Sequence, residues 1–302
     1  MTQMPPMRLV FLAMGRLLAA LSLWQIEEKR PRGVEVSRSS VGTTPITEWR
    51  QTGSQADPIA TVVIAHGFAG SRPLMTAYSW TLALNGYDVI AFDFEGHGTN
   101  PVPMSGDTTS IEGTTRRLVN ETLRGMEYAE AQSGAPPALL GQSMATDVLI
   151  RAALERETGP IVAISAFSGA VTAEAPENLL LIAGEWEARL IEFGREAIRM
   201  VDPEAVEGEI VGGRMALISP KVEHVGILYA PFALRETILW LDRSYGVPDR
   251  SPALATIGYW VLLLLAALMV LWRPISERLP KTGEASSVPR KALYWCAAIS
   301  FV

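Results

Sequence analysis

Short apolar runs alternate with longer amphipathic stretches from residue 33 to residue 250. The apolar runs are nearly continuous in Val, Ile, Leu and Ala, as expected of parallel strands that are buried on both faces of a sheet. They predict strands at 60–66, 88–93, 137–141, 160–166, 178–183 and 214–219. The stretches between these runs predict helices at 74–86, 110–132, 144–155 and 186–200.

This alternation of strands and helices predicts an α/β fold, a doubly wound domain with a mostly parallel sheet. Residues 34–52 alternate more regularly between apolar and polar positions, which predicts an antiparallel pair at one edge of the sheet. Ligands of such domains bind beyond the C-terminal ends of the strands. Residues that carry chemistry are therefore expected just after the predicted strands.

Two segments outside this domain are apolar enough to enter a membrane. Residues 256–272 carry no charge and reach the lower limit of about 17 residues for a spanning helix; a buried core helix is the alternative. Residues 9–24 carry Arg16 at their centre, where a charge is costly in lipid. They fit a signal anchor, an interfacial helix or a signal peptide, and the lack of a clear cleavage site favours an uncleaved anchor.

These segments divide the chain into three parts. Residues 1–32 form the N-terminal apolar anchor or signal segment, 33–250 the α/β domain, and 251–302 the C-terminal transmembrane region. Residues 292–302 begin like a second membrane helix and are too short to span, so we expect the sequence to be truncated there.

The distribution of basic residues next to the apolar segments predicts on which side of the membrane the α/β domain lies. Residues 273–291 form a short basic loop, which favours the cytoplasm and predicts an extracytoplasmic α/β domain on an integral membrane protein, in the inner membrane if the source is bacterial. Lys29, Arg30 and Arg32 favour the opposite orientation.

Composition narrows the classes of function. Charged residues make up 19% of the chain, below the average of about 25% for soluble proteins, in agreement with apolar segments in lipid. The net charge of −6 argues against nucleic acid as the partner, because phosphate binding needs a basic surface. Cys296 is the single cysteine, which excludes a disulfide within the chain and a cysteine-based metal site.

A serine lies between a predicted strand and a predicted helix. Ser143 has Gly141 and Ala145 at two residues on either side, and an abrupt strand-to-helix turn needs such small neighbours around a nucleophile. The N–H of Met144, at the helix start, would then stabilise developing negative charge. A serine that merely caps the helix explains the same pattern.

Two glycine-rich turns follow earlier strands. In AHGFAGS (65–71), the glycines allow close approach of a ligand, and the N–H of Phe68 is a candidate second donor to an oxyanion; a plain strand-to-helix turn is the alternative. In DFEGHG (93–98), we interpret His97 as a structural residue of the site rim. Asp93 is interpreted as a capping carboxylate of the turn.

Three segments together carry a resemblance: HGFAGS (66–71), GYDVIAFDFEGHG (86–98) and LLGQSMA (139–145). Their order and spacing resemble the α/β-hydrolase superfamily, above all its serine aminopeptidase-like and monoacylglycerol-lipase-like members. The resemblance covers roughly residues 33–246 and implies a serine hydrolase that needs no metal or cofactor. The serine motif departs from the family's G-H-S-M-G-G, with Ala145 and Thr146 in place of the two final glycines.

The superfamily orders its active-site residues as nucleophile, acid and base. The family has a Gly-x-x-Asp pattern at the end of the strand that corresponds to 178–183. Here the sequence is Gly184-Glu185-Trp186-Glu187, which places Glu187 at the acid position, with Glu185 as the competitor. Of the three histidines, only His224 follows the acid. The resemblance thus implies a catalytic set of Ser143, Glu187 and His224, with an oxyanion hole made by the N–H groups of Phe68 and Met144.

This set predicts hydrolysis of a carboxylic ester, a thioester or an amide through an acyl-enzyme. About a dozen residues separate the strands at 160–166 and 178–183, so no helical cap fits between them. Phe68, Met75, Met144 and Phe167 are expected to line an apolar pocket.

A membrane-anchored domain with such a pocket suggests a small-molecule or lipid ester as substrate and the lipid bilayer as partner. An inactive α/β-hydrolase-fold scaffold that binds a partner is the alternative. A transporter with further spans is a third interpretation.

Overall fold

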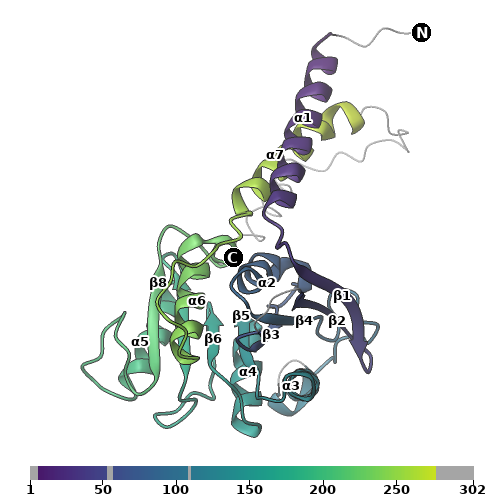
Figure 1. The fold of residues 1–302 in the computed structure, drawn as a ribbon. Helices are drawn as coiled ribbons and strands as arrows, with labels where there is room; N and C mark the ends of the chain where they lie inside the picture. The colour runs from purple at the N-terminus through teal and green to yellow at the C-terminus, as the bar shows by residue number, and fades with distance from the viewer. Residues whose placement is uncertain (1–5, 53–56, 108–109, 277–302) are drawn as a thin grey trace. The chain divides into compact units, whose positions relative to one another are not determined.

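The computed structural model describes residues 6–52, 57–107 and 110–276 (Figure 1). The chain divides into two compact units. One unit is Leu23–Leu262, which contains the sheet. The other combines α1 (Pro6–Glu28) as far as Ser22 with α7 (Gly258–Ser276) from Leu263 onward.

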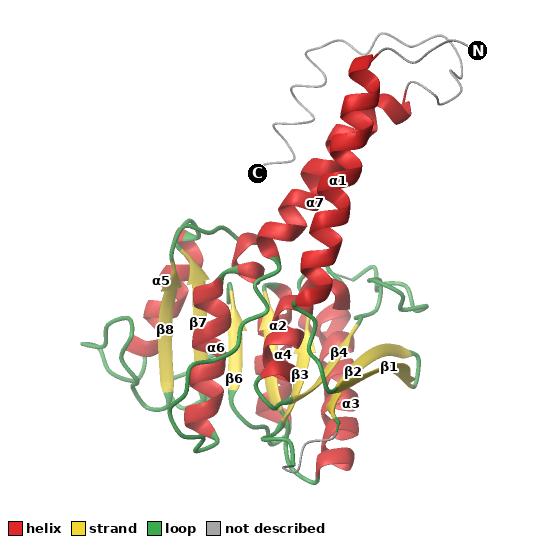
Figure 2. Ribbon diagram, turned by 45° about the horizontal axis from the view of Figure 1, so that its top comes forward, coloured by secondary structure: helices red, strands yellow, loops and turns green. Residues whose placement is uncertain are grey.

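Eight strands form a single sheet in the order β1-β2-β4-β3-β5-β6-β7-β8 (Figure 2). Strand β2 pairs antiparallel with both β1 and β4, and every other neighbouring pair is parallel. The predicted mostly parallel sheet and its antiparallel edge are thus confirmed. The strands are β1 (Val34–Val41), β2 (Thr44–Gln51), β3 (Thr61–Ala65), β4 (Asp88–Phe92), β5 (Ala138–Gln142), β6 (Ile161–Ile164), β7 (Leu179–Gly184) and β8 (Arg214–Ser219).

Helices cover both faces of this sheet and create two apolar cores (Figure 1). Helices α3 (Arg116–Ser133), α4 (Met144–Glu155) and α5 (Ala188–Arg199) pack on one face. Helices α2 (Thr76–Leu84) and α6 (Pro231–Ser244) pack on the other. The central strands β3, β5, β6 and β7 are buried along their whole length, which explains why their sequences are continuously apolar.

Helix α6 is the element that the apolar pattern did not predict. Pro231 stands in its first turn, where the missing N–H of proline removes no intrahelical bond. Ala233, Leu234, Ile238 and Leu241 are fully buried, at the spacing of one helical face. Charged residues between these positions divide the apolar pattern into short pieces, so it did not stand out in the sequence.

The second unit consists of two apolar helical segments that lie side by side (Figures 1 and 2). They meet closely at Gly15, where an added Cβ would lie 2.6 Å from Leu271 Cγ. By length and composition alone, Met7–Glu28 and Gly258–Ser276 are each long enough to cross a membrane. The predicted start of a further membrane helix at 292–302 lies outside the described residues.

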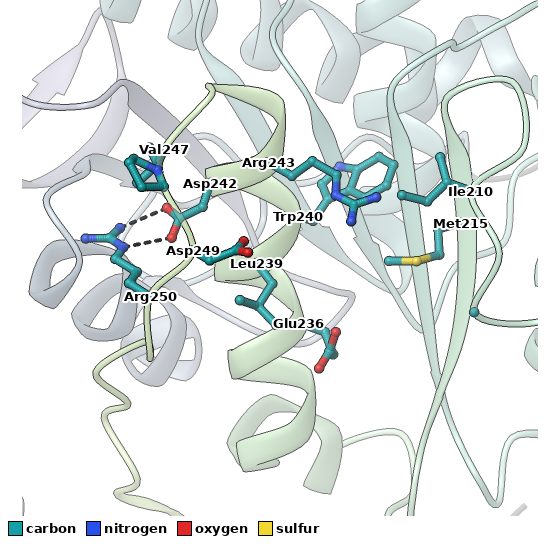
Figure 3. Close-up of a pocket in the computed structure, with 12 residues that line it drawn as sticks. Ile210, Met215, Glu236, Leu239, Trp240, Asp242, Arg243, Val247, Asp249 and Arg250 are labelled. Atoms are coloured by element: carbon teal, nitrogen blue, oxygen red, sulfur yellow. Dashed lines mark hydrogen bonds and ion pairs between the residues drawn. The ribbon is translucent and has the colours of Figure 1, made fainter.

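Asp242 of α6 joins the segment after this helix to Tyr87, the residue before β4. Its carboxylate accepts a hydrogen bond from Tyr87 Oη at 2.7 Å. It also accepts two from the Arg250 guanidinium, each at 2.8 Å (Figure 3). Asp242 is 4% exposed, so these bonds replace the water that the buried charge has lost.

Asp242→Ala should lower the free energy of unfolding by about 1–3 kcal/mol, because the buried Tyr87 hydroxyl and the Arg250 guanidinium lose their acceptor. Thermal unfolding of the full chain in detergent, followed by circular dichroism, measures the loss. Asp249→Ala is the matched control, since Asp249 is exposed on the same segment. Equal destabilisation by the two variants would contradict this role of Asp242.

Candidate active site

Ser143 is the single residue between the end of β5 and the start of α4. Its φ of 55° and ψ of −121° lie in a region that residues with a Cβ seldom adopt. A Cβ at Gly141 would lie 2.6 Å from Leu149 Cδ1 and 3.2 Å from Ala145 Cβ. The sharp turn therefore requires a glycine before the serine and a small residue after it, and it presents Ser143 at the C-terminal edge of the sheet.

A chain of hydrogen bonds connects Ser143, His224 and Glu187. Ser143 Oγ lies 2.8 Å from His224 Nε2, and His224 Nδ1 lies 2.5 Å from Glu187 Oε1. Glu187 follows β7, and His224 lies in the loop between β8 and the short helix η3 (Gly226–Tyr229). The structure therefore brings together three residues that the sequence analysis singled out from distant parts of the chain.

The Glu187 carboxylate has partners for both oxygens. Its Oε2 accepts hydrogen bonds from the Gly184 N–H at 2.6 Å and from Ser165 Oγ at 2.7 Å, while Oε1 faces His224. Burial alone would raise the pKa of Glu187, but the hydrogen bonds from His224, Gly184 and Ser165 outweigh burial and lower it. Glu187 is thus held as a carboxylate.

Glu185, the competing acid, has a different environment. It is exposed, and its Oε2 accepts the backbone N–H of Lys221 at 2.6 Å. This bond holds the loop after β8 in place. Glu185 makes no hydrogen bond to the His224 imidazole. The geometry therefore favours Glu187 over Glu185 as the partner of His224.

His224 is half-buried between its two partners. Its hydrogen bond to Glu187 raises its pKa above the ordinary 6.5, although burial opposes the change. A carboxylate at Nδ1 holds the proton on that nitrogen, so Nε2 is left to accept a proton from Ser143. The imidazole is thereby oriented as a base toward the serine.

The turn after β3 lies against the serine turn. A Cβ at Gly67 would lie 3.1 Å from Ser143 Cβ and clash with the Gln142 side chain. The backbone N–H groups of Phe68 and Met144 make no hydrogen bond to another described residue, and Met144 begins α4, where helical N–H groups have no intrahelical acceptor. Two N–H donors near Ser143 are thus free for a ligand.

His66 holds this turn in place. The ring is fully buried, and its Nδ1 donates to the Gly67 carbonyl at 2.8 Å while its Nε2 accepts the Phe94 N–H at 3.2 Å. Burial lowers the pKa of His66 to about 4, so the ring is neutral near pH 7. The roles of its two nitrogens are fixed by their partners, and His66 serves as a structural bridge between β3 and the turn after β4.

Asp93 and His97 occupy structural positions at the neighbouring turn. The Asp93 carboxylate accepts the backbone N–H groups of Arg72 at 2.8 Å and Thr99 at 2.9 Å, which is the arrangement of a turn-capping residue. His97 packs edge-on against Phe68, with 5.6 Å between ring centroids. Neither side chain is hydrogen-bonded to Ser143 or His224.

Thr146, which departs from the glycine of the family motif, is accommodated and bonded. Its side chain is 1% exposed, and Oγ1 lies 2.7 Å from the Ser143 carbonyl and 3.2 Å from both N and O of Phe167. The threonine therefore connects the serine turn to the loop after β6. The extra bulk does not obstruct the turn.

Two further polar residues support the site and were not found from the sequence. Gln142 Nε2 donates to the His224 carbonyl at 3.1 Å, and Ser165 Oγ donates to Glu187. Gln142 directly follows the predicted strand at 137–141, and Ser165 is second to last in the predicted strand at 160–166; this position near a strand end is the only signal that could have found them. Gln142 restrains the histidine loop, and Ser165 restrains the carboxylate.

The serine lies in an open cleft of about 620 Å³. Its apolar walls come from the turn after β3, the loop before α3, helices α3, α4 and α5, and the loop after β6. Residues 165–178, between β6 and β7, contain no helix, as predicted for a site without a cap. The apolar lining residues are Phe68, Met104, Leu118, Met144, Val148, Phe167 and Leu190.

Met75 was wrongly expected in this pocket. It is fully buried in the core on the α2 face of the sheet. Another pocket, between α6 and β8 near the Asp242–Arg250 pair, lies outside the site and contains neither Ser143 nor His224 (Figure 3). Within the described ranges, no group of three or more His, Cys, Asp or Glu side chains could hold a metal ion.

Residues 56–195 match the model of the family described as serine aminopeptidase, S33. This range includes Ser143 and Glu187 and ends before His224. Two solved structures share the fold at low identity. A predicted CIB-like hydrolase from Thermoplasma acidophilum is 16% identical, with a TM-score of 0.54 over 70% of this chain and 98% of the other. No curated protein matches the sequence.

A soluble variant of monoglyceride lipase from Saccharomyces cerevisiae, in complex with a substrate analogue, is 12% identical. Its TM-score is 0.51 over 71% of this chain and 96% of the other. The architecture that the chain shares with these structures is the α/β-hydrolase fold. The fold expected from the three sequence motifs is thus confirmed, and a sharp turn at Ser143 connects β5 to α4.

The pH dependence of the reactivity of Ser143 should follow His224. Because the Glu187 bond raises the pKa of His224, labelling of Ser143 by a fluorophosphonate should fall as the pH drops through a value above 6.5. Glu187→Gln should move this fall to lower pH, since the charge that stabilises the imidazolium is gone, and should slow labelling about 10³-fold or more. Glu185→Gln is the matched control and should leave the profile unchanged.

If Glu185→Gln moved the profile and Glu187→Gln did not, the assignment of the acid would be reversed.

Thr146→Val should lower the free energy of unfolding by about 1–3 kcal/mol, because the Phe167 N–H loses its buried acceptor. Thr146→Ser keeps the hydroxyl and should retain most of the stability. Thermal unfolding of both variants measures the difference. A serine variant that is less stable than the valine variant would show that the methyl group, rather than the hydroxyl, matters at this position.

Proposed function

We propose that the chain is a membrane-anchored serine hydrolase that cleaves carboxylic esters of hydrophobic acyl groups. The observation that carries this proposal is the hydrogen-bond chain from Ser143 through His224 to Glu187 at the floor of an uncapped apolar cleft. Ser143 is the nucleophile, His224 the base and Glu187 the acid.

The geometry supports acyl transfer in two steps. His224 Nε2 takes the Ser143 proton as Oγ attacks the ester carbonyl, and the N–H groups of Phe68 and Met144 bind the oxyanion. The bond to the leaving oxygen then breaks, and His224 gives its proton to the alcohol. Water, deprotonated by the same imidazole, attacks the acyl-enzyme and releases the carboxylic acid with Ser143 restored.

The cleft supports a hydrophobic acyl group. Its volume of about 620 Å³ lies within the range of about 300–1,000 Å³ that is typical of small-molecule sites. The aromatic rings of Phe68 and Phe167 are 65% and 67% exposed at its mouth, which is unfavourable in water unless a ligand or an apolar surface covers them. Thioesters and amides undergo the same chemistry and are secondary candidates.

Two observations support anchoring in a membrane. Met7–Glu28 and Gly258–Ser276 meet the length and hydropathy of a spanning helix. Both expose large apolar side chains along their length, among them Leu17 at 69% and Met269 at 76%, whereas a helix of a soluble core buries such residues. An anchored enzyme would meet its substrate in or near the bilayer, with the extracytoplasmic side as our proposed location.

Labelling by a fluorophosphonate probe tests the nucleophile. Detergent-solubilised wild type should be labelled, Ser143→Ala should show no labelling, and His224→Ala should lose about 10³-fold or more in rate. Ser40→Ala, on the exposed edge strand β1, is the matched control and should label like wild type. A folded wild type that is not labelled would support the alternative of an inactive scaffold.

Hydrolysis of p-nitrophenyl esters of increasing acyl length then tests the substrate class. We expect kcat/KM to rise from acetyl to octanoyl, and Phe167→Ala to reduce the octanoyl value about tenfold through lost apolar contact. A preference for acetyl esters or for peptide amides would contradict the hydrophobic ester.

A further inference from the structure

A second pocket, which we call the arginine pocket, opens on the α2 face of the sheet, with a volume of about 600 Å³. Arg30, Arg38 and Arg72 line it together with Trp49 and Trp80. None of its ten lining residues is acidic, in a chain whose net charge is −6. It contains none of the residues of the serine site.

Strand register builds one wall of this pocket. Arg38 of β1 pairs with Thr47 of β2, and Val36 pairs with Trp49. Side chains two residues apart on a strand share a face, so these four residues project together on the side where α2 packs. Trp80 of α2 faces them, and its indole continues the apolar surface formed by Trp49 and Val36.

The three arginines differ in how many of their hydrogen-bond donors already have a partner in the protein. Arg72 is fixed, with Nε 3.1 Å from Asp93 Oδ2 and Nη2 2.9 Å from Thr99 Oγ1, and its Nη1 has no hydrogen bond to another described residue. Arg30 pairs with Glu27 at 3.2 Å, an exposed contact of little strength. Arg38 has no ion pair or hydrogen-bonded side-chain partner among the described residues.

We propose that the arginine pocket binds the phosphate of an anionic phospholipid headgroup. Guanidinium groups bind phosphate oxygens through paired, charge-assisted hydrogen bonds, and Arg38 and Arg72 Nη1 offer unused donors. The tryptophans, Val36 and Pro73 give an apolar wall that matches the glycerol and the first carbons of the acyl chains. Inorganic phosphate alone would leave this wall without a partner.

The position of Arg30 favours a lipid as the source of the phosphate. Helix α1 ends at Glu28, so Arg30 lies two residues after the end of this helix. If α1 spans the bilayer, as proposed above, a residue at this place lies at the level of the headgroups, where arginine and tryptophan are favoured. The choice of lipid over free phosphate therefore rests on the proposed anchoring, whereas the anion site itself does not.

Calorimetric titration of the full chain in a nonionic detergent tests the proposal. The probe is an ether-linked dihexyl phosphatidylglycerol, which has no carboxylic ester for Ser143 to cleave, so binding is separate from any acyl transfer at Ser143. It should bind saturably, and Arg38→Gln should weaken it about tenfold, the loss expected from one charge-assisted contact. Arg124→Gln, with the same change of charge on an exposed face of α3, should leave binding unchanged.

The analogous phosphatidylcholine and inorganic phosphate complete the experiment. Weak binding of both supports an anionic headgroup site. Inorganic phosphate binding as tightly as the lipid would overturn the lipid source, and equal effects of Arg38→Gln and Arg124→Gln would overturn the arginine pocket as the site. Since Ser143→Ala should bind the probe like wild type, failure here and failure of the hydrolase proposal are distinguishable.

Discussion

The parallel pairing of β3, β5, β6, β7 and β8 is the constraint on which the site depends. Because these strands run in one direction, the turns after β3, β5, β7 and β8 all emerge at the same edge of the sheet. The pairings Gln142 with Ile164, Ile164 with Ile182, and Gly184 with Ser219 carry this alignment from the serine turn to the histidine loop. A slip of one residue in any pair would turn side chains to the opposite face and separate groups that must meet within hydrogen-bonding distance.

Around this edge, polar groups that have lost water are supplied with protein partners. Glu187 remains charged because three donors surround it, while the fully buried His66 remains neutral because burial lowers its pKa to about 4. The surroundings thus lower the pKa of His66 and raise the pKa of His224. Burial dominates at His66, and the carboxylate dominates at His224.

The sequence predicted most of the sheet because strands buried on both faces are continuously apolar, a pattern that a soluble loop does not produce. The resemblance to the α/β-hydrolase superfamily, with its order of nucleophile, acid and base, nominated Ser143, Glu187 and His224. Helix α6 was missed because charged residues interrupt its apolar face, and Met75 was misplaced because no local pattern tells which face of a sheet a turn residue enters. Gln142 and Ser165 act through contacts with residues far along the chain, which a single sequence does not encode locally.

The backbone conformation of Ser143 affects which residues are favourable for stability at this position. A residue with a Cβ at a φ of 55° and a ψ of −121° holds the turn at a cost of about 1–3 kcal/mol, and glycine would release that cost. Most proteins are only slightly more stable than their function requires. A protein that did not need the hydroxyl would therefore be stabilised by glycine at this position. Folding alone therefore favours glycine at this position, and the serine hydroxyl is kept at a cost in stability.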